Sequence, residues 1–496
     1  MIIAIDQGTT GTTCIVFDEG GRIAGRAYQE FSQHFPRPGW VEHDAAEIWE
    51  VSRAVAHEAL GAAGVDGNRL TAVGITNQRE TVVAWEPMSG EPLHRAIVWQ
   101  DRRTARRCDE LREQGYEPLI RERTGLVLDP YFSGTKMEWL VKEGGVDPSA
   151  AFGTVDSWLA FKLTGRHVTD YSNASRTLLF DIHALSWDRE LCELLGVDPD
   201  SLPDPLPSAH VYGETSEFGG RVPVAGIAGD QQAALYGQAC HAAGLGKNTY
   251  GTGSFVLENA GGDAPAAERG LITTVAWGVE DRVDYALEAA IFVTGAAVQW
   301  LRDSLGLIET AGETEHLARS LDSNDGVYMV PALAGLGSPH WDPYARGTIV
   351  GLTRGTGRAH LARAALESIA YQTADAVHAM EGASGLPLEE LRADGGAVHN
   401  SWLMAFQADV LGVPVVVPEV SETTALGAAY LAGVATGLWT ESDVRGMWRE
   451  ARRYEPSMSE DVREGLLAEW RRAIERSRGW AAAEVTKPPP SGSTRT

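Results

Sequence analysis

The first 85 residues alternate short apolar runs with polar turns, and this pattern predicts a mixed α/β layer. One stretch, roughly residues 44–63, is long enough for a helix, with Asp44 as a suitable start and Gly64 as a suitable end. The apolar runs on either side are short, as strands are, and lie at residues 2–5, 14–17, 22–28, 71–76 and 81–85.

A turn rich in glycine and threonine joins the first two predicted strands and recurs later in the chain. Segments 2–17 and 247–257 both run strand, turn, strand, about 240 residues apart. Glycines let backbone N–H groups approach an anion closely, and threonines add hydroxyl donors. The repeat favours two related domains, each with a phosphate-handling turn and joined near residues 238–247. Two unrelated turns are the alternative.

Three helices are expected in the later chain, at about 359–381, at about 400–411 and from about Thr423 onward. A strand within 391–397 leads toward the second of these helices through two glycines. Because glycines carry no side chain, the start of that helix is open to the approach of a nucleotide.

Length and charge limit the classes of protein. A chain of 496 residues exceeds the size at which one core keeps growing, so two or three domains with a cleft between them are expected. The 44% hydrophobic and 22% charged residues are typical of a globular protein. A formal net charge of −26 argues against nucleic acid or an anionic membrane as the main partner, since either would be repelled.

The chain shows no membrane-spanning or secretory pattern. No run of about 18 apolar residues occurs, and no basic segment followed by an apolar one opens the chain, so a cytoplasmic protein is expected. The cysteines are far apart and lack C-x-x-C spacing, which favours reduced thiols in the core; they are Cys14, Cys108, Cys192 and Cys240.

Asp230 is the first candidate for chemistry. The apolar run 222–227 ends just before it and a helical pattern follows it, so it lies where a strand ends and a helix begins. It could simply cap that helix. Two neighbouring amides, Gln231 and Gln232, and the second Gly/Thr turn about twenty residues later favour another interpretation. In it, the carboxylate is a base beside a phosphate site, as in kinases.

A second polar cluster, residues 76–81, includes Arg79 and Glu80 and lies between two predicted strands. Its amide, guanidinium and carboxylate groups are the mixed donors and acceptors that polyol hydroxyls need. A surface turn with a weak Arg–Glu pair is the alternative. The aromatic-rich segments 98–103 and 131–140 are by default core or rim.

Other nucleotide and metal motifs are absent from the sequence. It has neither a Gly-x-x-x-x-Gly-Lys-Ser/Thr segment nor a Gly-x-Gly-x-x-Gly turn followed by an acidic residue about twenty positions on. The 13 histidines are scattered, so a histidine metal centre is not expected.

Together these segments resemble the FGGY carbohydrate kinase family, within the actin-like and hexokinase-like ATPase superfamily, and its glycerol kinases in particular. The resemblance covers residues 1–455. It rests on two family signatures, at 131–140 and 347–367, and on the segments 6–10, 76–81, 229–234, 247–253 and 338–347.

The resemblance implies two duplicated ribonuclease H-like domains, with mixed β-sheets flanked by helices and an active site in the cleft between the domains. Residues 1–243 would form the N-terminal domain, with the polyol site, the first phosphate hairpin and the catalytic Asp. Residues 244–478 would form the C-terminal domain, with the second hairpin and the adenosine site, and 479–496 a disordered tail.

The resemblance also implies a reaction, the ATP-dependent phosphorylation of glycerol to sn-glycerol 3-phosphate in glycerol catabolism, with Asp230 as general base. The residues implied to bind the polyol are Arg79, Glu80, Tyr131, Asp230 and Gln231, with Trp99 and Phe255 along the carbon chain. Those implied to bind the nucleotide are Thr9, Thr10, Gly11, Thr252, Gly295, Gln299, Gly396 and Asn400. Asp6 would hold Mg²⁺ through water, and a homo-oligomer, dimer or tetramer, is expected.

Two departures from the family pattern concern nucleotide binding and regulation. Many members carry an Arg shortly after the Thr-Thr pair, where this chain has Thr13, so one contact to the phosphates is absent or comes from elsewhere. The loop 217–221 lacks the longer Gly-Gly-Lys-Gly-Gly segment that binds fructose 1,6-bisphosphate in some members, so inhibition by that sugar is not expected. No histidine there matches the phosphorylation site of regulated members, although His210 lies nearby.

Two other functions stay open at this point. The chain could be a kinase of the same family for a pentulose, a hexonate or a longer polyol, but the segment 77–80 is of the glycerol type. It could also be a non-catalytic nucleotide-binding switch of the actin or heat-shock ATPase type. Asp230 beside a polyol-type pocket argues against such a switch.

Overall fold

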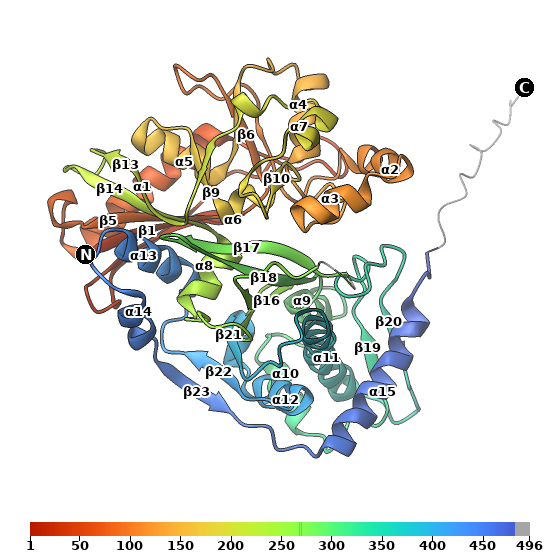
Figure 1. The fold of residues 1–496 in the computed structure, drawn as a ribbon. Coiled ribbons are helices and arrows are strands. Elements are labelled where there is room, and N and C mark those ends of the chain that lie inside the picture. Colours follow the sequence, from red (N-terminus) through yellow and green to blue (C-terminus); the bar gives the residue numbers. More distant parts are fainter. Residues whose placement is uncertain (267, 269, 482–496) are drawn as a thin grey trace, which may run out of the picture.

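The computed structural model describes residues 1–266, 268 and 270–481, so most of the expected tail lies outside the described residues. A 13-stranded sheet runs through the molecule, with helices packed against it (Figure 1). Its N-terminal half has the order β3 (Ile23–Glu30), β2 (Gly11–Phe17), β1 (Ile2–Gln7), β5 (Ala72–Asn77), β14 (Val222–Gly229), β13 (Ala209–Thr215). Its C-terminal half has the order β17 (Ile272–Val279), β18 (Arg282–Ile291), β16 (Ser254–Gly261), β15 (Gly246–Tyr250), β21 (Leu391–Gly395), β22 (Val415–Pro418), β23 (Glu450–Tyr454).

The two halves repeat one topology. β1 pairs antiparallel with β2 and parallel with β5, and β5 pairs parallel with β14. In the C-terminal half, β15 pairs antiparallel with β16 and parallel with β21, which pairs parallel with β22. This repetition is what a duplicated domain predicts. The halves join through one residue pair, Ala209 of β13 and Val279 of β17, so the two sheets form one.

The predicted helices lie where the sequence placed them. α1 (Ala45–Ala63) begins after Asp44, whose carboxylate accepts hydrogen bonds from two backbone N–H groups, and ends at Gly64, which has a φ of 66°. The others are α8 (Asp230–Gly237), α11 (Arg358–Ser384), α12 (Ser401–Leu411) and α13 (Thr423–Ala435). One detail differs: a 3₁₀ turn, Gly396–His399, separates β21 from α12.

Two further groups of elements surround the sheet. The N-terminal half carries an added layer with a four-stranded sheet, in the order β4 (Glu42–His43), β7 (Ala96–Ile97), β6 (Val82–Trp85), β8 (Ala151–Thr154). Its helices are α2 (Ala105–Glu113), α3 (Glu117–Thr124), α4 (Gly134–Lys142), α5 (Val155–Thr164), α6 (Tyr171–Ala174) and α7 (Arg189–Leu195), and its short strands are β9 (Val168–Asp170), β10 (Phe180–Asp181), β11 (Ser186–Trp187) and β12 (Asp204–Leu206). The C-terminal half adds α9 (Gly295–Asp303), α10 (Glu313–Arg319), β19 (Tyr328–Val330), β20 (Thr348–Val350), α14 (Glu441–Met447) and α15 (Glu460–Ser477).

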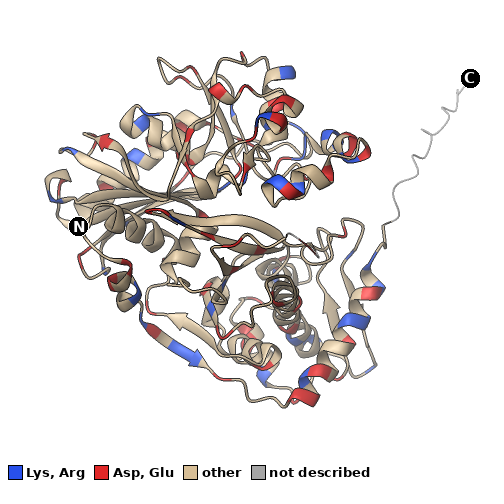
Figure 2. Ribbon diagram, viewed as in Figure 1, with Lys and Arg blue, Asp and Glu red and all other residues tan. Residues whose placement is uncertain are grey.

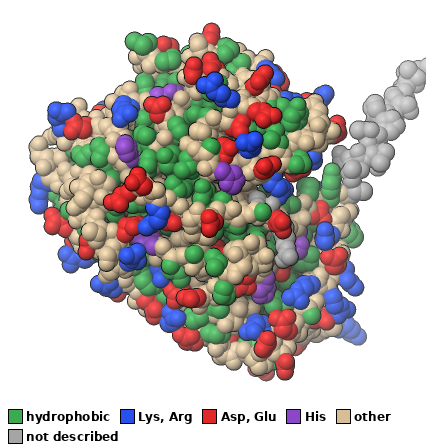
Figure 3. Space-filling model, viewed as in Figure 1, with side chains coloured by type: hydrophobic (Ala, Val, Ile, Leu, Met, Phe, Trp, Pro, Cys, Tyr) green, Lys and Arg blue, Asp and Glu red, His purple; other side chains and the backbone are tan. Residues whose placement is uncertain are grey.

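Charged residues of both signs lie on the outer helices, α15 among them (Figure 2). On the face drawn in Figure 3, basic side chains are interspersed with acidic ones rather than gathered in one patch. All four cysteines are buried and free, as predicted. Within the described ranges, no helix has the length and apolar character needed to cross a membrane.

Helices α8 and α13 cross where the two halves meet. α13 comes late in the chain yet packs over β1, β5 and β14, whereas α8 packs against β15 and β16. A Cβ on Gly427 would lie 1.8 Å from the carbonyl oxygen of Ala233, and a Cβ on Gly237 would lie 2.0 Å from that of Thr423. Glycine at both positions therefore lets the two helix backbones touch, and this contact fixes the position of Asp230 at the start of α8.

Replacing Gly427 with Ala should push α8 and α13 apart. Overpacking of this kind costs about 1–3 kcal/mol, so the thermal denaturation midpoint should fall. Gly465→Ala in α15 is the matched control, because a Cβ there would meet nothing within 4 Å. Its midpoint should stay level or rise slightly, since alanine favours helices more than glycine does. Equal midpoints for the two variants would contradict a close crossing.

Candidate active site

Asp230 lies at the junction of β14 and α8, as the sequence predicted. Its Oδ1 accepts a hydrogen bond from the backbone N–H of Gln231 (2.7 Å) and lies 3.1 Å from Nε of Arg79. Its side chain is 31% exposed, so a ligand can reach the carboxylate. Burial raises the pKa of Asp230 above its ordinary value, and the charges of Arg79 and Lys247 act against that increase.

Arg79 belongs to a network of four buried charges that spans both halves of the sheet. Glu288 of β18 accepts hydrogen bonds from Nη1 of Arg79 (2.5 Å) and from Nη2 of Arg176 (2.9 Å). Nε of Arg176 donates to Oε1 of Glu80 (2.7 Å). None of the four side chains is more than 2% exposed. The interpretation of residues 76–81 as a surface turn is therefore wrong.

Pairing with the two arginines opposes the effect of burial on both carboxylates. Burial acts to raise the pKa of Glu288, but Arg176 and Arg79 outweigh it and lower the pKa to about 2. Burial raises the pKa of Glu80, and the same two arginines oppose that rise. A buried charge without a partner is costly, so each member of the network depends on the others. Glu80 also has a φ of 62°, a strained backbone of the kind that clusters at functional sites.

The three aromatic residues that the sequence predicted for the polyol site, Trp99, Tyr131 and Phe255, lie beside this network. The rings of Trp99 and Tyr131 are 5.6 Å apart and edge to face. The guanidinium of Arg79 lies 5.6 Å from the centre of the Phe255 ring. Nε1 of Trp99 donates to Oγ1 of Thr9 (2.9 Å), so the first Gly/Thr turn contacts the same group of residues.

A cavity of about 450 Å³ brings together five of the residues expected to bind a nucleotide, namely Thr252, Gly295, Gln299, Gly396 and Asn400. Apolar side chains, including Val298, Ile369 and Leu403, also line it. α9 begins against the second Gly/Thr turn: a Cβ on Gly295 would lie 2.6 Å from the carbonyl oxygen of Gly251. The absence of a side chain there leaves the backbone of the turn and of the helix start in contact.

The other three expected nucleotide residues, Thr9, Thr10 and Gly11, do not line this cavity. Thr9 and Thr10 lie in the turn between β1 and β2, and Gly11 is the first residue of β2. Thr13, the residue that departs from the family pattern, pairs with Asp6 across that hairpin. The structure thus separates the predicted nucleotide residues into two groups, one from each half.

Asp6 is the last but one residue of β1. Burial, together with the nearby carboxylates of Asp230 and Glu422, raises the pKa of Asp6 to about 7. In the described part of the chain, its carboxylate accepts no hydrogen bond. Among the described residues, no group of three or more His, Cys, Asp or Glu side chains lies close enough together to hold a metal ion by itself.

Sequence reasoning missed three residues of this site, Arg176, Glu288 and Lys247. Glu288 is a single charge within the apolar run 286–290 and Arg176 lies close to the apolar run 178–180, and a charge in such a place is a sign of a buried partner. Lys247 is one of only five lysines in the chain and precedes the second Gly/Thr turn. Nothing in the sequence could tell which charges pair with which.

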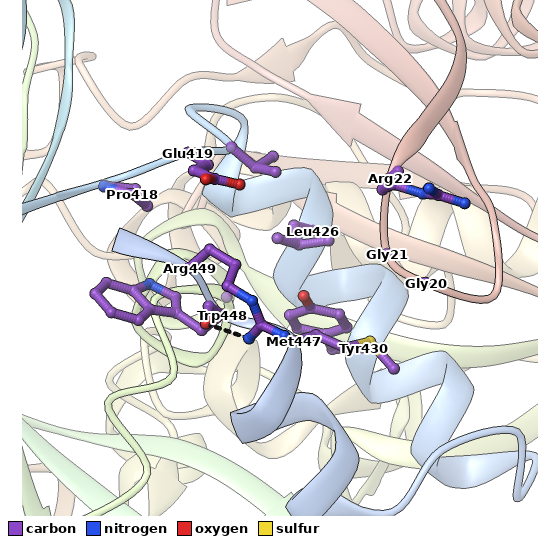
Figure 4. A pocket seen from close by; sticks show the side chains of 12 residues that line it. Gly20, Gly21, Arg22, Pro418, Glu419, Leu426, Tyr430, Met447, Trp448 and Arg449 are labelled. Atoms are coloured by element: carbon purple, nitrogen blue, oxygen red, sulfur yellow. Dashed lines mark hydrogen bonds between the residues drawn. The ribbon is translucent and has the colours of Figure 1, made fainter. Parts of the chain in front are cut away.

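A second cavity of about 450 Å³ lies beside the crossing of α8 and α13 (Figure 4). The turn between β2 and β3, α13 and the segment after α14 line it, with Tyr430 and Arg449 among the side chains. Arg449 donates to the carbonyl oxygen of Trp448, the dashed line in Figure 4. None of the predicted site residues lines this cavity, so the candidate active site comprises the cavity lined by Thr252, Gly295 and Asn400 and the charge network around Arg79.

Two family models match the chain and together cover most of it. They are the N-terminal domain of the FGGY family of carbohydrate kinases, over residues 1–237, and the C-terminal domain of the same family, over residues 246–436. The fold and the site therefore define a two-domain carbohydrate kinase. The chain belongs to the FGGY family, which confirms the resemblance found in its sequence.

Individual relatives match over nearly the whole length. Glycerol kinase 2 of Thermotoga maritima is 56% identical over 490 residues, covering 97% of this chain and 99% of the relative. Glycerol kinase of Symbiobacterium thermophilum is 55% identical over 492 residues, with 97% and 99% covered. The crystal structure of Plasmodium falciparum glycerol kinase with ADP is 34% identical and has a TM-score of 0.90, covering 96% of this chain and 98% of that one. The predicted fold class is thereby confirmed.

Glu288→Gln keeps the shape of the side chain but removes one of the two negative charges that pair with Arg79 and Arg176. Breaking a buried pair costs about 3–5 kcal/mol, so the thermal denaturation midpoint should fall clearly. Glu441→Gln is the matched control, because Glu441 of α14 forms a partly exposed ion pair with Arg282, which lies on the same strand as Glu288. Exposed pairs contribute only about 0–1 kcal/mol. A midpoint for Glu288→Gln as high as that of the control would show that the network does not hold the two halves.

Proposed function

We propose that this chain transfers the γ-phosphoryl group of ATP to glycerol, forming sn-glycerol 3-phosphate and ADP. The observation that carries the proposal is the position of Asp230, which is accessible at the start of α8 and in contact with Arg79. A base beside a buried set of polar groups suits a small polyol, and a cavity for a nucleotide lies in the other half. Similarity to glycerol kinases over 97% of the chain supports glycerol as the substrate.

In this proposal Asp230 is the general base. It takes the proton of a terminal hydroxyl of glycerol while that oxygen attacks the γ-phosphorus and the bond to the ADP oxygen breaks. The Gln231 N–H and Arg79 engage Oδ1, and no described residue donates a hydrogen bond to Oδ2, so Oδ2 is the oxygen that accepts the proton. Closure of the two halves around the substrates would exclude water as a competing acceptor.

The polyol site proposed here uses Arg79, Glu80, Tyr131 and Gln231 for the hydroxyl groups, with Trp99 and Phe255 along the carbon chain. The support is proximity, because these side chains lie around the charge network and Asp230. Three hydroxyls need several donors and acceptors in a small space, and charged or amide groups supply them.

We assign the nucleotide to both halves of the molecule. Thr9, Thr10 and Gly11 would contact the phosphates from one side and Thr252 from the other, while Gly295, Gln299, Gly396 and Asn400 would surround the adenosine. The proposed domains are 1–243 and 244–478, because α8 ends at Gly237 and β15 begins at Gly246.

A hydrated Mg²⁺ fits the residues around Asp6. Mg²⁺ keeps several waters and uses one or two carboxylates together with phosphate oxygens, so a site without a full protein cage is suitable. Burial and the neighbouring carboxylates of Asp230 and Glu422 raise the pKa of Asp6, and a cation would compensate this negative charge. When bound, the metal would neutralise charge on the transferring phosphoryl group. Asp6 would orient it through water.

Three expectations from the sequence stay predictions: a homo-oligomer, a cytoplasmic location and the lack of inhibition by fructose 1,6-bisphosphate. The structure bears on the last. The loop that would bind the sugar is a short turn between β13 and β14, because Thr215 pairs directly with Val222 across it. Strong inhibition by the sugar would contradict this interpretation.

Purified protein with Mg²⁺ and ATP should release ADP in the presence of glycerol. A coupled ADP-release assay should be run with glycerol, dihydroxyacetone, erythritol and xylulose in parallel. Glycerol is expected to give the highest kcat/KM, since the proposed site suits a short chain with three hydroxyls. ADP release with xylulose and none with glycerol would mean that glycerol is not the substrate and that the chain is a pentulose kinase.

Asp230→Asn should lower kcat by roughly 10²–10⁴-fold, which is the usual contribution of a positioned base. Glycerol binding should change little, because the amide keeps the size and most hydrogen bonds of the carboxylate. Turnover by the ADP-release assay and glycerol affinity by calorimetry would be measured together. Asp18→Asn, at an exposed turn between β2 and β3, serves as the control and should keep normal turnover. Near-normal turnover of Asp230→Asn would exclude Asp230 as the base.

A further inference from the structure

Lys247 of β15 is fully buried and has no part in the steps described so far. Its Nζ donates hydrogen bonds to Oε1 of Gln231 and to Oγ1 of Thr249 (2.8 Å). Gln231 follows Asp230 on α8, whereas Lys247 and Thr249 belong to the strand that leads into the second Gly/Thr turn. One side chain therefore connects the strand of the proposed phosphate turn with the proposed polyol site.

The contact also fixes which way the amide of Gln231 faces. A lysine ammonium group only donates, so the oxygen of the amide must face Lys247 and its nitrogen must face away. Nε2 of Gln231 makes no hydrogen bond with any residue that the structure describes. Two N–H donors are thus free at a position next to the base, and a polyol hydroxyl is a suitable acceptor for them.

Charged groups face Lys247 from four elements. They are Asp394 of β21, Asp230 of α8, Arg79 of the turn between β5 and β6, and Glu288 of β18. Burial and Arg79 disfavour the charged lysine, the three carboxylates favour it, and its pKa falls to about 8. Lys247 is therefore mostly charged near neutral pH and loses its charge in mildly alkaline solution.

We propose that Lys247 is a positioning residue that couples the nucleotide site to the polyol site by holding the Gln231 amide in its glycerol-binding orientation. The inference rests on the proposed function. Phosphates bound at the turn 251–253 would fix β15, which carries Lys247, and thereby fix Gln231. Glycerol then binds more tightly when a nucleotide is present, and by reciprocity the nucleotide binds more tightly when glycerol is present.

Lys247→Met tests the coupling, since methionine has a similar length but cannot donate a hydrogen bond. Calorimetry would measure the Kd for glycerol with and without a non-hydrolysable ATP analogue and Mg²⁺. In the wild type the analogue should tighten glycerol binding by about 5-fold or more, a typical size for coupling between sites. In Lys247→Met this tightening should fall below about 2-fold, and the KM for glycerol should rise by more than kcat falls.

Lys136→Met is the matched control. Lys136 is also buried beside the polyol site, but its Nζ donates to the carbonyl oxygens of Tyr131 (2.5 Å) and Phe132 (3.2 Å), within the N-terminal half. Its loss should weaken glycerol binding equally with and without the analogue, so the ratio of the two Kd values should be unchanged. A general structural defect would lower affinity in the same way in both variants and would leave both ratios unchanged.

Two further measurements keep the test decisive. Thr249→Val leaves the lysine but removes one of its hydrogen-bond partners, so it should lower the coupling partly. It provides the test if Lys247→Met does not fold.

Glycerol affinity of the wild type should weaken as the pH rises through about 8, and Lys247→Met should lack this dependence. The inference is overturned if the ATP analogue tightens glycerol binding as much in Lys247→Met as in the wild type, or if it does not tighten glycerol binding in the wild type. Failure of the wild type to phosphorylate glycerol would instead overturn the proposed function.

Discussion

The arrangement of the site depends on one buried carboxylate. Glu288 enters from β18 of the C-terminal half and pairs with two arginines of the N-terminal half, Arg79 and Arg176. Each of these charges would be very costly to bury alone, and each is acceptable only because the others are in place. The ion pairs that set the relative position of the halves therefore also set the charge around the proposed polyol site. A shift of β18 would leave guanidinium groups unpaired beside Asp230.

Local features of the fold could be predicted from the sequence, and long-range pairs could not. Asp44 and Gly64 mark the ends of α1 because capping involves only neighbouring residues. The Gly/Thr hairpins were found for the same reason, since a turn and its two strands are contiguous. By contrast, Arg79 and Glu288 are 209 residues apart, and only the folded chain brings them together. A lone charge in an apolar run signals that a partner exists but does not identify it.

The close crossing of α8 and α13 is a second long-range contact that the sequence alone could not predict. The start of α13 is rich in small residues, and in the structure Gly427 lies directly against Ala233. The partner could not be read from the pattern, because α13 packs on the N-terminal sheet although it comes from the C-terminal part of the chain. This exchange of helices makes the position of Asp230, the proposed base at the start of α8, dependent on both halves. The residues of the proposed nucleotide cavity, which lie at 252 and between 295 and 400, also come together only in the folded chain.

The arginines around Asp230 are paired with carboxylates, so they leave little positive charge for binding the phosphates of a nucleotide. Arg79 and Arg176 are already balanced by Glu288 and Glu80, and Asp6 adds a carboxylate close to Asp230. A triphosphate brought here would meet few uncommitted cations in a chain with a net charge of −26. Thr13, where many family members carry Arg, reduces their number further. Backbone N–H groups of the Gly/Thr turns and a bound Mg²⁺ would then compensate much of the phosphate charge. Nucleotide binding in this chain should therefore depend more strongly on Mg²⁺ than in members that keep the arginine.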